Sequence, residues 1–144
     1  LIFILIIFFL DRYTKLLVLN NFSENIFFLN DYINLDLVWN TGIGFGLLSS
    51  NSNLIYNLTS LLIVIVIIFL IYFLIGSDKY EKIIYSIIIG GALGNFYDRM
   101  LFKAVPDFID LHYKNFHWFT FNLADIFITC GIIAFLLKGF YIKN

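Results

Sequence analysis

Residues 54–75, LIYNLTSLLIVIVIIFLIYFLI, contain no charged side chain and are rich in leucine and isoleucine. An α-helix needs about 20 apolar residues to cross a hydrocarbon layer that is about 30 Å thick. This segment is long enough, and Gly76-Ser77-Asp78, which follows it, is a turn signal. We therefore predict a membrane-spanning helix at 54–75 with a purely structural role.

Three further segments, at 1–20, 81–100 and 121–140, are apolar at one end and polar at the other. Because successive spans run in opposite directions, these polar ends all lie on the same side of the membrane. We therefore predict one domain over 1–144, an all-α membrane protein with four transmembrane helices. The polar ends hold Asp11 and Lys15, then Asn95, Asp98 and Arg99, then Asn122 and Asp125.

The composition agrees with a membrane protein, because 61% of the residues are hydrophobic and only 13% are charged, against roughly 25% charged in soluble proteins. The net charge of −1 offers no basic patch, so we expect membrane lipid and no nucleic acid as a partner. The single cysteine, Cys130, cannot form an internal disulfide, and we expect it to be a small packing residue.

Two segments, 21–53 and 101–120, lie between the predicted spans. Residues 33–37 alternate apolar and polar side chains, which is typical of a half-buried strand. Trp39 and Phe45 suit a membrane interface, and the aromatic residues of 101–120 fit an interfacial belt. We predict a small β-sheet on the membrane surface.

In the segment 81–100, polar and small residues share a helix face. Gly91, Asn95 and Asp98 are spaced i, i+4 and i+7, while Gly90 and Gly94 form a G-x-x-x-G pair. This pattern predicts a helix that packs closely against its neighbours, with a polar stripe on the inside. Helix packing alone would account for the glycines.

Several carboxylates could carry chemistry. Asn122 and Asp125 could be an N-cap and an acidic residue in the first turn of a helix, which is a structural role. Asp107 lies among apolar neighbours just outside a span. Two carboxylates packed side by side share a proton, so one activates water while the other donates to a carbonyl oxygen. This is aspartyl-peptidase chemistry, for which Asp98, Asp107 and Asp125 are all eligible.

Other sites are less well supported by the sequence. His112 and His117 are five residues apart, no H-E-x-x-H motif is present, and a third zinc ligand is not obvious, so we predict no metal. No G-x-S-x-G motif is present. Asp11 and Lys15, four residues apart, could be only an ion pair on a helix face.

Two other functions use the same residues. A proton path through Asp98, Arg99 and Asp125 is possible in principle, because ionisable residues inside membranes mark such paths. It would need polar residues along the whole bundle, and 54–75 supplies almost none. A presenilin-type protease would fit Tyr97-Asp98, but its G-x-G-D partner motif is absent.

The chain resembles bacterial lipoprotein signal peptidase (signal peptidase II). The third and fifth of five ordered blocks are the most specific. The blocks are Leu10-Asp11-Arg12-Tyr13-Thr14-Lys15; Asn40-Thr41-Gly42 with Phe45; Gly90-Gly91-Ala92-Leu93-Gly94-Asn95-Phe96-Tyr97-Asp98-Arg99; Val105-Pro106-Asp107-Phe108-Ile109-Asp110; and Phe121-Asn122-Leu123-Ala124-Asp125.

The resemblance implies an intramembrane aspartyl endopeptidase without a cofactor, with Asp107 and Asp125 as its catalytic pair. Its substrate would be a prolipoprotein with a diacylglyceryl group on the lipobox cysteine, cut just before that cysteine. Asp98 would support the site. The residues implied to hold the substrate or organise the pair are Asn40, Gly42, Asn95, Arg99 and Asn122, flanked by Asp11 and Lys15.

The resemblance also implies a multi-pass protein of the bacterial cytoplasmic (inner) membrane, with the active site near the extracytoplasmic face. A small sheet and a loop helix would lie on that face, and we expect a monomer. Three positions depart from the family pattern. Arg12 stands where glutamine is usual, Pro106 where valine is common, and Ile126 where a small residue is common.

Overall fold

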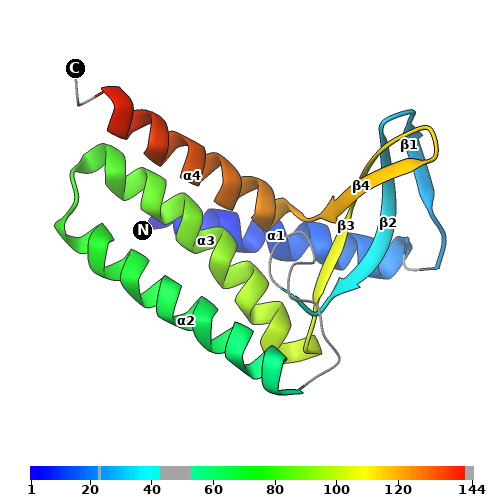
Figure 1. The fold of residues 1–144 in the computed structure, drawn as a ribbon, viewed down its shortest axis with the longest axis horizontal. Helices are drawn as coiled ribbons and strands as arrows, with labels where there is room; N and C mark the ends of the chain where they lie inside the picture. Colours follow the sequence, from blue (N-terminus) through cyan, green and yellow to red (C-terminus); the bar gives the residue numbers. More distant parts are fainter. Residues whose placement is uncertain (23, 43–52, 142–144) are drawn as a thin grey trace.

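The structure is a computed structural model that describes residues 1–22, 24–42 and 53–141. The described residues form a helical bundle with an antiparallel sheet at one end (Figure 1). The first and last residues of each helix lie within two residues of the bounds of the corresponding predicted span. The elements are α1 (Ile2–Asn21), β1 (Phe27–Asn30), β2 (Ile33–Asn40), α2 (Asn53–Gly76), α3 (Lys79–Phe102), β3 (Val105–Tyr113), β4 (Phe116–Phe121) and α4 (Leu123–Tyr141).

Helix α3 is the centre of the bundle and contacts α1, α2 and α4. Glycines allow the close approach. A Cβ atom at Gly90 would lie 2.9 Å from Cβ of Ile7 on α1, and one at Gly91 would lie 2.7 Å from the carbonyl oxygen of Ala124 on α4. Real Cβ atoms do not approach other atoms so closely. The predicted close packing of this helix is therefore confirmed.

Apolar and polar residues are distributed in the opposite way from a soluble protein. Large apolar side chains face outward, with Phe9 63% and Ile68 61% exposed, while Lys15, Asp98 and Asn122 are fully buried. Within the described residues, one helix, over Tyr56–Gly76, is long and apolar enough to cross a membrane by length and composition. It coincides with the predicted span at 54–75. Crossing by the other three helices stays a prediction.

The sheet has the order β1-β2-β3-β4, and every neighbouring pair is antiparallel. The strand predicted at 33–37 lies within β2. The segment 101–120, which we predicted only as an aromatic surface segment, instead contains β3 and most of β4. The described residues of 21–53 and 101–120 include no separate loop helix, and residues 43–52, with Phe45, lie outside the described part of the chain.

The end of the bundle away from the sheet is held by the α2–α3 turn (Figure 1). Asp78 begins α3 as its N-cap, and its side chain accepts hydrogen bonds from the backbone N–H groups of Tyr80 and Glu81. Lys138 of α4 forms ion pairs with both Asp78 and Glu81. The turn signal after 54–75 is thus confirmed. Cys130, in contrast, lies exposed on α4, so the prediction that it is a small packing residue was wrong.

Candidate active site

Asp107 and Asp125 lie close together although they come from different elements. Asp107 is in β3 and Asp125 is in the first turn of α4. Asn122, between β4 and α4, contacts both of them. Its Nδ2 donates to Oδ1 of Asp107 at 2.5 Å, and its backbone N–H donates to Oδ2 of Asp125 at 3.3 Å. The Asp125 N–H donates back to Oδ1 of Asn122 at 3.1 Å. This reciprocal pair is the N-cap arrangement that the sequence suggested, and it also joins the two carboxylates.

Amide side chains hold the remaining carboxylate oxygens. Nδ2 of Asn40, the last residue of β2, donates to Oδ2 of Asp107 at 2.9 Å. Nδ2 of Asn95 on α3 donates to Oδ1 of Asp125 at 2.8 Å. Among the described residues, no lysine or arginine forms an ion pair with either carboxylate. The two acids are therefore held by neutral donors.

The surroundings of Asp107 favour its protonated form. The residue is 2% exposed, and burial, followed by repulsion from Asp125, raises its pKa from 3.8 to about 7. The hydrogen bonds from Asn40 and Asn122, and the charge of Lys15 beyond ion-pair distance, act in the opposite direction but do not cancel the effect of burial. A carboxyl group with such a pKa can exchange a proton near neutral pH.

A second group of acids lies beside the first and is paired with cations. Lys15 Nζ lies 2.7 Å from Oδ2 of Asp11 and 2.7 Å from Oδ2 of Asp98. Arg12 forms a further ion pair with Asp98, and its guanidinium lies 4.9 Å from the ring centre of Tyr97. Arg12, which stands where glutamine is usual in the family pattern, therefore supplies a counter-charge for Asp98. The ion pair between Asp11 and Lys15 is confirmed and is fully buried.

The ion-paired group orients the amide-held group. Lys15 Nζ donates to Oδ1 of Asn95 at 2.8 Å, which leaves the Asn95 amide nitrogen facing Asp125. Asp11 accepts a hydrogen bond at 3.0 Å from the backbone N–H of Ala124, the residue before Asp125. Helix α1 thereby fixes both α3 and the start of α4 at the site.

Arg99 and Gly42 connect α3 to the end of β2. Arg99 donates to the carbonyl oxygens of Gly42 and Asn95, the latter at 3.1 Å. The Gly42 N–H donates to Oδ1 of Asn40 at 2.8 Å. Tyr56 of α2, which the sequence did not single out, donates to the carbonyl oxygen of Arg99. All ten predicted site residues thus belong to one connected network.

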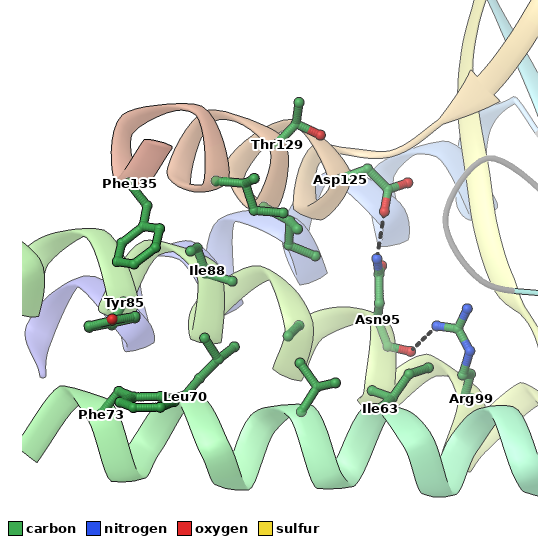
Figure 2. Close-up of a pocket in the computed structure, with 14 residues that line it drawn as sticks. Ile63, Leu70, Phe73, Tyr85, Ile88, Asn95, Arg99, Asp125, Thr129 and Phe135 are labelled. Atoms are coloured by element: carbon green, nitrogen blue, oxygen red, sulfur yellow. Dashed lines mark hydrogen bonds between the residues drawn. The ribbon is translucent and has the colours of Figure 1, made fainter. Parts of the chain in front are cut away.

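A cavity of about 640 Å³ opens between α2, α3 and α4. Figure 2 shows Asp125, Asn95 and Arg99 at one end of it and Phe73, Tyr85 and Phe135 at the other. Apart from Tyr85 and Thr129, the rest of the lining is apolar, so the described residues provide little support for a proton path. Asp107 and Ile126 are not among the lining residues. Pro106 is buried in β3, opposite Trp39 of β2.

The two histidines lie away from this network. His112 and His117 face each other across β3 and β4, and Asp110 lies between them. The spacing of these histidines in the sequence offers no obvious third ligand, whereas in the structure a carboxylate oxygen lies near both rings. The hairpin register brings Asp110 to them, which the spacing of the histidines alone did not reveal.

Comparison with known proteins agrees with the fold. A bundle of helices with a small sheet occurs in two solved structures of bacterial membrane enzymes. The first is 26% identical in sequence and has a TM-score of 0.85. The match covers 99% of this chain and 88% of the other chain. The second is 27% identical and has a TM-score of 0.77. The match covers 95% of this chain and 89% of the other chain. The fold class is therefore the one found in these two bacterial membrane enzymes, a helical bundle with a small antiparallel sheet.

The sequence comparisons give the family. The profile described as signal peptidase (SPase) II matches residues 3–141. A lipoprotein signal peptidase of Pelagibacter ubique is 45% identical over 100% of this chain and 89% of its own length. One of Anaplasma phagocytophilum is 47% identical over 74% of this chain and 68% of its own length. The chain belongs to the signal peptidase II family, a family of proteases.

Proposed function

We propose that this protein is an aspartyl endopeptidase of the bacterial inner membrane that removes signal peptides from lipid-modified prolipoproteins, with Asp107 and Asp125 as the catalytic pair. The family and the relatives named lipoprotein signal peptidase support the substrate class. The single observation that carries the mechanism is that Asn122 contacts two buried carboxylates that have no cationic partner among the described residues.

Amide donors suit a carboxylate pair that must hold and release a proton. A lysine or arginine bound to either acid would favour the charged form of that acid. Asn40, Asn95 and Asn122 instead fix the geometry with neutral groups. Because like charges at short range disfavour double ionisation, the pair retains one proton. This feature distinguishes Asp107 and Asp125 from Asp98, which has Arg12 and Lys15 as partners.

The reaction follows from that shared proton. The charged carboxylate takes a proton from water as the water oxygen attacks the scissile carbonyl carbon, and the neutral carboxyl donates its proton to the carbonyl oxygen. The resulting tetrahedral diol collapses when the C–N bond breaks. One carboxyl group protonates the leaving nitrogen, while the other takes a hydroxyl proton from the new acid. One water is consumed, and the pair again holds one proton.

The cavity provides a place for an apolar substrate. Its largely apolar lining leads from Phe73 and Phe135 to Asn95 and Asp125, so an apolar signal peptide or its lipid chains would bury apolar surface there. The products would be the free signal peptide and a lipoprotein that begins with the lipidated cysteine. Arg99, Asn40 and Gly42, at the polar end of the network, would hold the substrate backbone.

The distribution of side chains supports the proposed membrane placement. The outward-facing apolar residues of α1, α2 and α4 include Phe9, Ile68 and Leu137, and a lipid environment would cover them without an energetic penalty. The chain would be one domain over 1–144 with four spans, acting as a monomer. The sheet and the carboxylate pair would lie near the extracytoplasmic face.

Cleavage of a lipidated prolipoprotein by the purified protein tests this proposal. Asp107→Asn and Asp125→Asn should each lower the rate by about 10³-fold or more, because each removes one proton-transfer group. Asp31→Asn, which changes an exposed carboxylate at the β1–β2 turn, should keep the full rate. Full activity in either of the first two variants, with folding verified by thermal denaturation, would exclude the proposed pair.

A further inference from the structure

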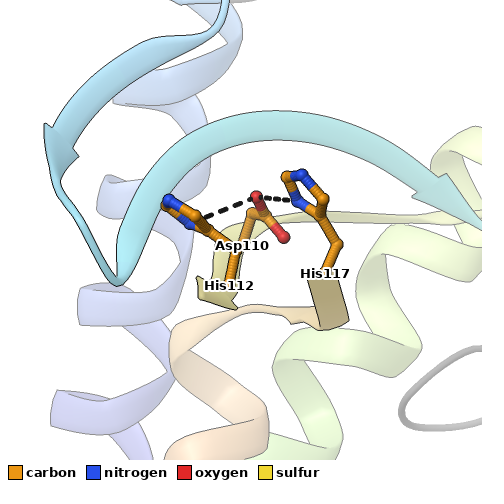
Figure 3. Close-up of side chains that lie close together, drawn as sticks. All are labelled: Asp110, His112 and His117. Carbon is orange, nitrogen blue, oxygen red and sulfur yellow. Dashed lines mark hydrogen bonds and ion pairs between the residues drawn. The ribbon is translucent and has the colours of Figure 1, made fainter. Parts of the chain in front are cut away.

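Three side chains with metal-binding atoms meet near the tip of the β3–β4 hairpin. Asp110 and His112 are on β3, and His117 is on β4 (Figure 3). His112 and His117 are direct partners in the strand register, and their rings are stacked with centroids 5.3 Å apart. Oδ2 of Asp110 lies 2.7 Å from Nδ1 of His117 and 3.7 Å from Nδ1 of His112. One carboxylate oxygen thus lies between two imidazole nitrogens.

This cluster contains a buried nitrogen without a partner. His112 is 7% exposed and Asp110 is 3% exposed. Nδ1 of His112 has no hydrogen-bond partner, although it points toward Asp110. An unpaired buried polar group is destabilising, because it has lost its hydrogen bonds to water. Asp110 is hydrogen-bonded to His117, and this bond leaves Nδ1 of His112 unpaired.

A neighbouring amide repeats this feature. Asn34 of β2 is the register partner of Asp110, so their side chains lie on the same face of the sheet. Oδ1 of Asn34 is also buried without a hydrogen-bond partner. Two electron-pair donors without partners therefore flank one carboxylate. A cation would satisfy such an arrangement, whereas an anion or a further acceptor would not.

The cluster is separate from the catalytic pair. Successive side chains of a strand point to opposite faces, so Asp110 and His112 lie on the face opposite to Asp107. The contacts agree, because Asp107 binds Asn40 and Asn122, while Asp110 binds His117. No residue is shared between the two groups.

We infer that Asp110, His112 and His117 bind a divalent transition-metal ion, with Zn²⁺ as the best match. Two imidazole nitrogens and a carboxylate oxygen are a common ligand set for zinc, with water completing the coordination. The ligand atoms already lie within 4.8 Å of one another. Zinc holds such atoms at about 2.0–2.2 Å from itself, which brings them to roughly 3.4 Å apart. His117, whose side chain is 56% exposed, can turn to reach that geometry.

A bound ion would join β3 to β4 outside the catalytic network. The hairpin connects the strand that carries Asp107 to the residues that lead into α4 and Asp125. The ion would therefore stiffen both supports of the carboxylate pair without touching either acid. This role is independent of the peptidase function, and it does not require the ion to take part in bond cleavage.

Metal binding by the full-length protein in detergent, purified with a histidine-free tag and stripped of metal, tests the inference. Zn²⁺ in competition with a chromophoric chelator should bind with a stoichiometry of one, and Co²⁺ should give the visible absorption of a tetrahedral or five-coordinate site. His117→Ala, the substitution least coupled to folding, should weaken binding by at least about tenfold. His112→Ala and Asp110→Asn should do the same where they fold.

Two matched variants separate this site from the rest of the molecule. Asp31→Asn and Asp107→Asn should bind Zn²⁺ as the unsubstituted protein does, and Zn²⁺ should raise their Tm but not that of His117→Ala. Failure of the peptidase proposal would leave these results unchanged. Absence of stoichiometric Zn²⁺ or Co²⁺ binding at micromolar concentration, or binding that survives in both histidine variants, would overturn the inference.

Discussion

Two groups of buried acids lie side by side at the sheet end of the bundle, and they differ in what binds them. Asp11 and Asp98 are paired with Lys15 and Arg12, whereas Asp107 and Asp125 accept hydrogen bonds from asparagine side chains. Ion pairs fix charge, while amides fix position and leave the protonation state free to change. The comparison separates an acid that holds the helices together from an acid that can perform catalysis.

The largest expected effect is on stability, in the ion-paired group. Asp98→Asn leaves the buried guanidinium of Arg12 without its counter-charge, and breaking a buried pair in this way costs about 3–5 kcal/mol. Thermal denaturation in detergent at pH 7 should show a clear fall in Tm for Asp98→Asn, and no comparable fall for Asp107→Asn. Equal losses in the two variants would remove the distinction between the groups.

The pH dependence of stability should differ between the groups. The pKa of Asp107 is about 7 in the folded protein and 3.8 in the reference state, so the folded chain binds a proton that the unfolded chain releases between these values. The proton on Asp107 therefore stabilises the folded protein. This stabilisation is complete below about pH 4 and is lost as the pH rises through 7. The stability of Asp107→Asn relative to the unsubstituted protein should therefore rise by about 3 kcal/mol between pH 5 and pH 8, because about 1.36 kcal/mol per pH unit applies over about two units.

Thermal denaturation at both pH values gives this difference directly. The matched variant is Asp31→Asn, whose carboxylate is exposed; its difference from the unsubstituted protein should not change with pH. A difference for Asp107→Asn that stays constant from pH 5 to pH 8 would argue against a proton held at Asp107.

A smaller effect is expected from one amide donor. Asn40→Ala removes the hydrogen bond to Oδ2 of Asp107, and this bond lowers the pKa of that carboxyl. The variant should show a kcat about tenfold lower, the usual scale for one such hydrogen bond, and the alkaline limb of its pH profile should move to higher pH. Asn57→Ala, at an exposed position of α2, should leave both unchanged. A loss of kcat without movement of the limb would indicate a purely structural role for Asn40.

Much of the fold could be predicted because the helices are long apolar segments, and composition alone locates such segments. Strands β3 and β4 were missed for a physical reason. The first four residues of β3 are all buried, while the first four of β4 are all exposed. In the sequence, β3 alternates apolar and polar residues only over 109–112, and β4 loses the alternation at the adjacent residues Trp118 and Phe119, so neither strand shows a sustained period of two.

The candidate site was less accessible to sequence reasoning. Position along the chain placed Asp98, Asp107 and Asp125 at one membrane face, but it could not rank them. Asp98 is paired with Arg12 and Lys15, more than 80 positions away in the sequence, and both contacts depend on the packing of α1 against α3. The selection of Asp107 in the sequence analysis came from the family resemblance. The geometry adds a physical reason, which is the absence of a cationic partner among the described residues.

Infrared spectroscopy of the carboxyl groups tests the central claim most directly. Because the pKa of Asp107 is raised to about 7, a protonated-carboxyl band should be present at pH 5 and should disappear with a midpoint near pH 7. The band should persist in Asp31→Asn and should be missing from Asp107→Asn. A spectrum without a carboxyl band that titrates between pH 5 and pH 8, or a band that survives in Asp107→Asn, would contradict the proposal that the amide-held pair carries the catalytic proton.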